Sequence, residues 1–193
     1  MPPLSPAEGE IEAVMFLERF FRPKPAQIAG RALYSAVVAQ SRTPALYLEL
    51  GAPDTPVGRF EIYSLHVVLL LDRLKRNGPQ AADTAQALFD TYVRSLDDAL
   101  RELGVGDLSV GKKMRKLGEA FYGRVKSYQD AFALLPAQDE LRDLLARTVY
   151  AETEATAEPQ LRAYVLAQRA ALEAAPLEDL LAGKVAWTSE VSA

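Results

Sequence analysis

Three aspartates spaced seven residues apart are the first side chains in this sequence whose pattern could serve chemistry. Asp83, Asp90 and Asp97 lie within one predicted helix, where a seven-residue spacing places them on one face. Acidic clusters on helices hold magnesium diphosphate in enzymes that act on polyprenyl substrates. The Asp-Asp-x-x-Asp pattern fails, however, because Arg101 stands where the last acid is needed. We therefore favour a solvated face with ion pairs, and we keep a helical polyprenyl or diphosphate enzyme as the alternative.

The segment from Gly106 to Lys112 fits the G-x-x-x-x-G-K pattern of a phosphate-binding loop. That loop requires a strand before it and a Ser or Thr after the lysine. Here a helix is predicted before the segment, and Lys113 follows it. We favour a glycine turn between two helices, with Asp107 or Ser109 as the N-cap of the second.

Cysteine and histidine are almost missing, which removes several classes of site. The chain has no cysteine and one histidine, which excludes disulfides, thiolate zinc sites and sites that need two imidazoles. His66 stands among apolar neighbours such as Leu65 and Val67, so we predict a core residue bonded to a buried acceptor. We therefore predict no catalytic residue, no metal site and no cofactor.

Six basic side chains lie within residues 104–136, a stretch with few acidic residues. They are Lys112, Lys113, Arg115, Lys116, Arg124 and Lys126. Clustered like charge disfavours folding through self-repulsion, so the cluster indicates an anionic partner, which would be a lipid surface, RNA or an acidic protein. The alternative is a solvated face balanced by the acidic stretch at residues 79–103.

Four apolar side chains near the amino terminus are interspersed with basic ones. They are Phe16, Leu17, Phe20 and Phe21. The composition suits a helix that lies on a membrane or contacts a client protein. It also suits a terminal helix docked on the body of the protein, which we favour because the stretch is short.

Helices would position all of these side chains, since no stretch alternates with a period of two. Pro and Gly punctuation predicts a compact all-α bundle with short loops. The predicted helices span residues 11–21, 25–42, 44–50, 57–76, 80–103, a segment from Asp107 or Ser109 to just before Pro136, 138–152, 159–174 and 177–181. The helix at 57–76 is apolar on nearly every face, so we expect it in the middle of the bundle.

The expected core draws on two neighbouring helices. Ile28, Ala32, Val37 and Val38 should lie close to the core, and one face of the next long helix carries Leu88, Tyr92, Leu96, Leu100 and Leu103. Gly104 stands where a left-handed residue is expected to end that helix.

Charge and hydropathy set the expected location of the protein. The longest apolar stretch is about ten residues, against the roughly 20 that a spanning helix needs. The first residues lack the pattern of a secretory signal. We expect a cytoplasmic protein, at most peripheral on the cytoplasmic face of the inner membrane. A net charge of −4 disfavours DNA as a partner.

A series of short motifs follows in order between residues 31 and 134. They are Leu33-Tyr34, Val38–Arg42, Pro53-Asp54-Thr55, Gly58-Arg59-Phe60, Leu65-His66, Asp72-Arg73-Leu74, Gln86–Asp90, Leu100–Gly111 and Ala120–Arg124. In order and spacing they resemble the ubiquinol–cytochrome c chaperone family, and we interpret the chain as a bacterial member.

The resemblance implies an all-helical, non-enzymatic assembly factor that binds newly made cytochrome b during biogenesis of the ubiquinol–cytochrome c reductase complex. It further implies contact with the ribosome or a membrane surface, and in mitochondrial relatives a small partner protein. We divide the chain into an N-terminal tail and amphipathic helix (1–30), the core chaperone domain (31–135) and a C-terminal helical extension packing on the core (136–193). A peripheral lipid-binding module without an assembly role stays open as a further alternative.

Overall fold

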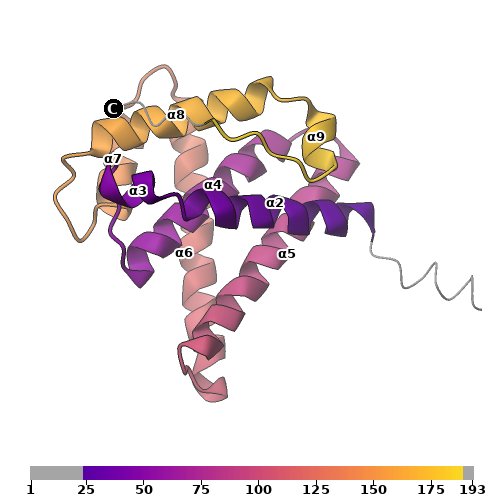
Figure 1. The fold of residues 1–193 in the computed structure, drawn as a ribbon, viewed down its shortest axis with the longest axis horizontal. Coiled ribbons are helices and arrows are strands. Elements are labelled where there is room, and N and C mark those ends of the chain that lie inside the picture. The colour runs from indigo at the N-terminus through magenta and orange to yellow at the C-terminus, as the bar shows by residue number, and fades with distance from the viewer. Residues whose placement is uncertain (1–23, 189–193) are drawn as a thin grey trace, which may run out of the picture.

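The structure, a computed structural model, describes residues 24–188. In this range the chain forms eight α-helices and no strand, so the predicted all-α fold is confirmed (Figure 1). The helices are α2 (Pro25–Ser41), α3 (Pro44–Leu48), α4 (Pro56–Leu74), α5 (Pro79–Glu102), α6 (Asp107–Ala133), α7 (Asp139–Thr148), α8 (Glu158–Ala174) and α9 (Leu177–Leu181). None of these helices combines the length and apolar character needed to cross a bilayer.

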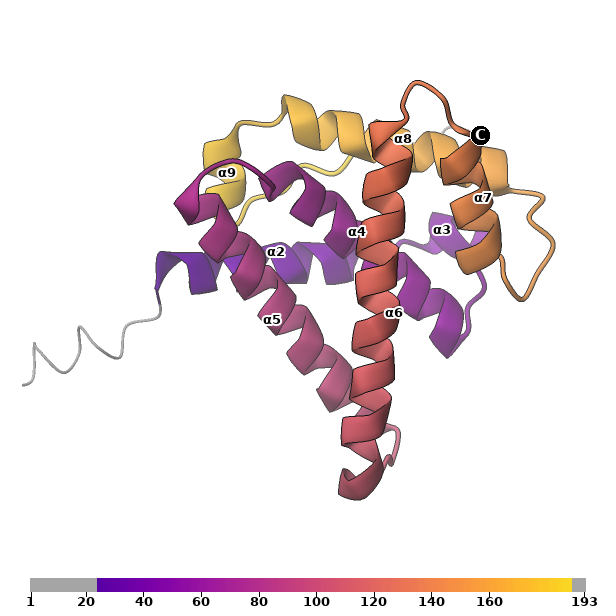
Figure 2. The ribbon, with the colours of Figure 1, turned by 180° about the vertical axis from the view of Figure 1, so that it is seen from behind.

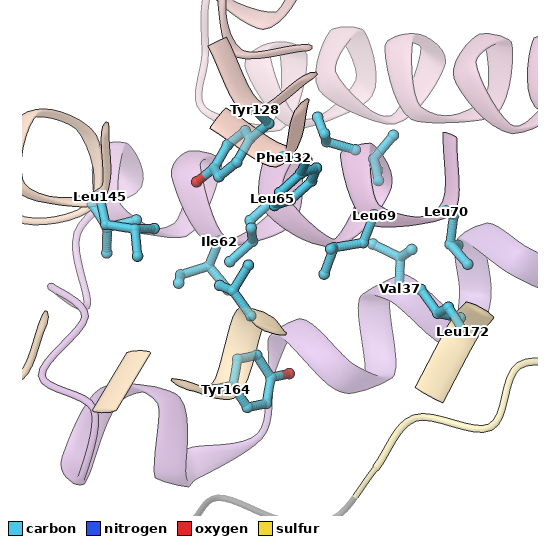
Figure 3. Close-up of a cluster of buried hydrophobic side chains, with 14 of the residues drawn as sticks. Val37, Ile62, Leu65, Leu69, Leu70, Tyr128, Phe132, Leu145, Tyr164 and Leu172 are labelled. Atoms are coloured by element: carbon cyan, nitrogen blue, oxygen red, sulfur yellow. The ribbon is translucent and has the colours of Figure 1, made fainter. Parts of the chain in front are cut away.

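Helix α4 is the central element, as its sequence predicts, and it packs against α2, α5, α6 and α8. The Thr55 hydroxyl accepts a hydrogen bond from the Gly58 amide at 3.1 Å and Pro56 follows at the first helical position, which fixes where α4 begins. Every residue from 64 to 70 is buried. Leu65 and Leu69 lie among Tyr128 and Phe132 of α6 (Figure 3), and each fully buried Leu contributes roughly 1.5–3 kcal/mol.

Helices α2 and α5 cross closely because a glycine lies at the contact. A Cβ on Gly30 would lie 2.6 Å from backbone atoms of Ala87 and Leu88. Val37 on the same face is fully buried, as predicted, whereas Ile28 is 55% exposed. The prediction for Ile28 is wrong because, at 100° per residue, Ile28 lies opposite the face that carries Leu33 and Val37.

Helices α5 and α6 form a hairpin whose end projects away from the other helices (Figures 1 and 2). Gly104 has φ +77°, which confirms the predicted left-handed residue. The predicted N-cap of α6 is wrong, because Gly106 takes that position without a side-chain cap. Asp107 is instead the first helical residue, and its carboxylate accepts a hydrogen bond from Arg101 at 2.6 Å.

The predicted glycine turn between two helices is confirmed, since residues 103–106 connect α5 to α6 and residues 107–112 form the first turns of α6. Leu88 and Tyr92 are buried as expected. Leu103 is 72% exposed although its spacing matches theirs, because the hairpin end extends beyond the body.

The last helices close the bundle on the side of α2 and α4. Helix α8 packs on α4 and α9 packs on α2, and residues 182–188 then return along α8 (Figure 1). The buried amide of Gln168 bonds both backbone groups of Thr188, at 2.8 and 3.0 Å. The Trp187 ring lies edge-on to His66 with centroids 5.3 Å apart. The domain boundary at 135/136 stays a prediction.

Candidate functional site

A groove with largely apolar walls runs between α2, α4 and α5, with a volume of about 780 Å³. Its lining consists of Tyr34, Val38, Arg42, Pro56, Arg59, Phe60, Tyr63, Tyr92, Ser95, Leu96, Asp98, Ala99, Glu102 and Leu103. This volume lies in the range of cavities that take a small ligand or several side chains of a partner.

The entry turn of α4 builds one wall of the groove. The preceding loop packs tightly against the first turn of α4, because Gly58 has no side chain and the Pro53 carbonyl occupies the space that a Cβ would take. Across this turn the Arg59 guanidinium contacts the Asp54 carboxylate at 2.6 Å. The tight turn holds Phe60 in the groove wall.

Hydrogen bonds fix the tyrosine rings of the groove. The Tyr34 hydroxyl bonds to the Ser95 hydroxyl, and the Tyr92 hydroxyl bonds to Ser64 Oγ at 2.8 Å. The Tyr63 hydroxyl accepts from Arg42 Nε at 2.8 Å. Burial raises the pKa of the Tyr34 and Tyr92 hydroxyls, which therefore stay neutral. Because their polar ends are engaged within the fold, these rings offer rigid apolar surface.

The two rims of the groove carry opposite charge. Asp98 and Glu102 are exposed on the α5 rim, and neither forms an ion pair within residues 24–188. Arg42 and Arg59 stand on the opposite rim, where Arg59 is paired with Asp54. A bound segment with a basic flank would therefore be oriented by these rims.

The apolar surface continues beyond the basic rim. A hollow of about 400 Å³ is lined by Arg42, Arg59 and Tyr63 together with Tyr47 and Leu48 of the α3 region. Leu48 is 83% exposed. The groove and this hollow form one continuous surface, because they share three lining residues.

The structure separates the six predicted basic residues into two groups. Lys112, Lys113 and Lys116 are exposed near the start of α6, and Arg115 lies 3.8 Å from Glu119. Further along α6, Arg124 forms two hydrogen bonds of 2.7 Å with the buried Glu61 carboxylate, and Lys126 contacts Asp130 at 2.6 Å. Arg124 is thus engaged inside the fold, while the three lysines face solvent.

The three aspartates of the alternative enzyme do not converge. Asp83 and Asp90 line a polar hollow of about 700 Å³ between α2 and α5, which also contains Lys24, Arg31 and Arg94. Asp97 is not part of that hollow and contacts Arg101 at 2.7 Å, one of the ion pairs that the spacing predicts. Across residues 24–188, no group of three His, Cys, Asp or Glu side chains lies close enough to hold a metal.

His66 is a core residue, as predicted. Its side chain is fully buried, with Nδ1 2.8 Å from the Ile62 carbonyl and Nε2 2.7 Å from the Tyr164 hydroxyl. Nδ1 therefore donates to the carbonyl and Nε2 accepts from the tyrosine, which is the neutral tautomer. Burial lowers the pKa of His66 to about 4.

The predicted amino-terminal contact lies outside the described residues. Phe16, Leu17, Phe20 and Phe21 all precede residue 24. Their role as a membrane or client contact stays a prediction.

Sequence reasoning did not identify the groove, although two signals pointed to it. Tyr34 and Phe60 lie within the short motifs on which the family resemblance depends. Leu103 stands at the end of the amphipathic face of α5, beyond Tyr92, the last residue of that face that is fully buried. Only the crossing of three helices brings these residues together.

A helical scaffold with an apolar, aromatic-walled groove is typical of proteins that bind an apolar segment of a partner. Comparison with known sequences makes this specific: the chain belongs to the ubiquinol–cytochrome C chaperone family, whose sequence model matches residues 48–187. The predicted family is thereby confirmed. The chain is accordingly an assembly chaperone for ubiquinol–cytochrome c reductase.

A solved structure agrees with the family assignment. The chain is similar to the Cbp3 homolog from Brucella abortus, a bacterial protein with a crystal structure. The two sequences are 35% identical, and the two structures superimpose with a TM-score of 0.78. The match covers 92% of this chain and 97% of that one. A search of the curated proteins gave no match.

Proposed function

We propose that this chaperone binds newly synthesised cytochrome b and holds an apolar segment of it in the groove between α2, α4 and α5. Cytochrome b is a membrane subunit, so its segments expose apolar side chains until they are inserted and assembled. A preformed groove with aromatic walls suits such a segment, because apolar helices bind to protein surfaces in this way.

The observation that carries the proposal is the combination of exposed apolar side chains with fixed ring positions. Leu103 is 72% exposed at one end of the groove and Leu48 is 83% exposed beyond the other. Between them, the hydroxyls of Tyr34, Tyr63 and Tyr92 are bonded to the scaffold. Little side-chain entropy is lost when a client covers such rigid surface, which favours binding.

We infer a non-catalytic role in the cytoplasm, in which the protein shields its client until assembly proceeds. The rim charges support the choice of client. Segments that flank membrane helices on the cytoplasmic side are rich in Lys and Arg. Asp98 and Glu102 would contact such a basic flank while the apolar part fills the groove.

The experiment places a charge in the groove without disturbing the fold. Ala99 is exposed on α5 and lines the groove, whereas Ala82 is exposed on the same helix outside it. Ala99→Glu and Ala82→Glu therefore make a matched pair. Each is produced together with tagged cytochrome b, and the amount of chaperone that co-purifies is measured.

We expect Ala99→Glu to lose at least tenfold in cytochrome b recovery, because a carboxylate in an apolar site must be desolvated on binding. Ala82→Glu should bind like the wild type. In a strain that lacks the chaperone gene, only Ala82→Glu should restore the b-type haem spectrum of the membranes. Equal recovery by both variants would show that the client binds elsewhere.

A further inference from the structure

The end of the α5–α6 hairpin combines two features that rarely occur together on a soluble surface. Leu103 in the connecting turn is 72% exposed. The first turns of α6 then carry Lys112, Lys113 and Lys116, all exposed. At 1.5 Å per residue the three lysines lie within about 14 Å of the start of α6. Both features lie on the part of the molecule that projects furthest from the body (Figures 1 and 2).

The three lysines are not balanced by the acids around them. Within residues 24–188 none of the three forms an ion pair. On and next to α6 the acids are engaged, since Asp107 and Asp97 both contact Arg101, at 2.6 and 2.7 Å, and Glu119 lies 3.8 Å from Arg115. Asp98 and Glu102, on the groove side of α5, form no ion pair within residues 24–188. The first turns of α6 therefore carry an excess of positive charge, which an anionic surface would balance.

The composition of this surface favours lipid over nucleic acid. Residues 100–117 contain no aromatic side chain, whereas proteins that bind single-stranded RNA stack bases on aromatic rings. An exposed leucine in the turn that leads into a lysine-bearing helix matches the pattern of interfacial contacts, in which an apolar side chain enters the headgroup layer and cations meet anionic lipid.

We propose that the end of the α5–α6 hairpin docks on an anionic membrane surface through Lys112, Lys113 and Lys116, with Leu103 inserted between the headgroups. Leu103 and Glu102 also line the groove, so docking brings one end of the groove to the bilayer surface. A groove held at the bilayer surface would receive client segments before or after their insertion. This role in client binding rests on the proposed function, whereas the docking itself does not.

The test is co-sedimentation of the full chain with vesicles of phosphatidylglycerol and phosphatidylcholine, compared with phosphatidylcholine alone. The charge-reversal variant is Lys112→Glu/Lys113→Glu/Lys116→Glu. Its matched control changes net charge equally at exposed positions away from the hairpin end, as Arg31→Glu/Lys75→Glu/Lys184→Glu. Leu103→Ser tests the apolar contact separately. Thermal unfolding of each variant verifies that it is folded.

We expect the wild type and the control triple variant to bind the anionic vesicles, and binding to weaken as salt rises. The Lys triple variant should lose roughly a hundredfold in partition coefficient, and Leu103→Ser about tenfold. Equal binding by the Lys and control triple variants would overturn the proposal. Binding to RNA without binding to the vesicles would also overturn it. The vesicle assay contains no cytochrome b. Loss of vesicle binding therefore tests the docking proposal alone, and the Ala99→Glu experiment tests cytochrome b binding separately.

Discussion

Arg124 of α6 and Glu61 of α4 form a bidentate ion pair, in which Nε and Nη2 of the guanidinium each donate to a carboxylate oxygen at 2.7 Å. The Glu61 side chain is only 5% exposed, so Arg124 is its source of charge compensation in a poorly solvated site. The pair joins the base of the hairpin to the central helix. A residue that sequence analysis assigned to a binding surface therefore also has a structural role.

Removing one member of this pair should be strongly destabilising. We expect Arg124→Ala to lower the free energy of unfolding by about 3–5 kcal/mol, because it leaves the Glu61 carboxylate buried without a partner. Urea denaturation measures the loss. Lys126→Ala, which breaks an exposed pair with Asp130 on the same helix, is the control and should leave the unfolding midpoint unchanged. Similar midpoints for the two variants would contradict the assigned role of Arg124.

Stability should fall as the pH drops below the ordinary pKa of histidine. The pKa of His66 is about 4 in the folded protein and about 6.5 in the unfolded chain, so the unfolded state binds the proton more readily. The stabilisation is fully present above pH 6.5 and is lost between pH 6.5 and 4, with a change of about 2 kcal/mol between pH 7 and 5.

The pH effect is measured on wild type and His66→Gln by urea denaturation, followed by emission of Trp187, the single tryptophan. Trp187 lies against His66 and reports the loss of tertiary structure directly. The difference between the two proteins isolates His66 from the titrating carboxylates. Parallel curves over pH 7 to 5 would mean that His66 keeps its ordinary pKa.

Two glycines should respond to alanine in opposite directions. A Cβ on Gly118 of α6 would meet no atom within 4 Å, so Gly118→Ala should raise the free energy of unfolding by about 0.5–1 kcal/mol. Gly30→Ala should lower it by about 1–3 kcal/mol, because α2 and α5 would have to separate. Chemical denaturation of both variants measures the two changes in the free energy of unfolding. A loss of stability in Gly118→Ala would contradict the open space found around Gly118.

The returning segment after α9 should depend on one buried amide. Gln168→Glu replaces the donor that bonds the Thr188 carbonyl and introduces a charge at a fully buried position. We expect a loss of about 2–3 kcal/mol at pH 7. Gln160→Glu, an exposed position on the same helix, is the matched control and should behave like wild type. Limited proteolysis of the C-terminal segment should accelerate only in Gln168→Glu.

Local pattern was sufficient for most of the helices. The ends of α2, α3 and α9 agree with the predicted ranges to within two residues, because Pro starts and Gly or polar stops are encoded at those positions. The N-cap of α6 was mispredicted because Asp107 has an alternative partner in Arg101, which a local rule does not include. Ile28 was mispredicted because apolar character alone does not say which face of a helix meets its neighbour.

The amino-acid sequence by itself determined the helical class, the central place of α4, the core position of His66 and the family resemblance. Each follows from local composition or spacing, which act within a few turns of helix. Only the tertiary structure decided which charges are engaged and where apolar surface remains uncovered. Arg124 and Lys116 look alike in sequence, yet one meets Glu61 across 63 positions of chain and the other meets solvent. Such pairings depend on how helices cross, and the groove exists for the same reason.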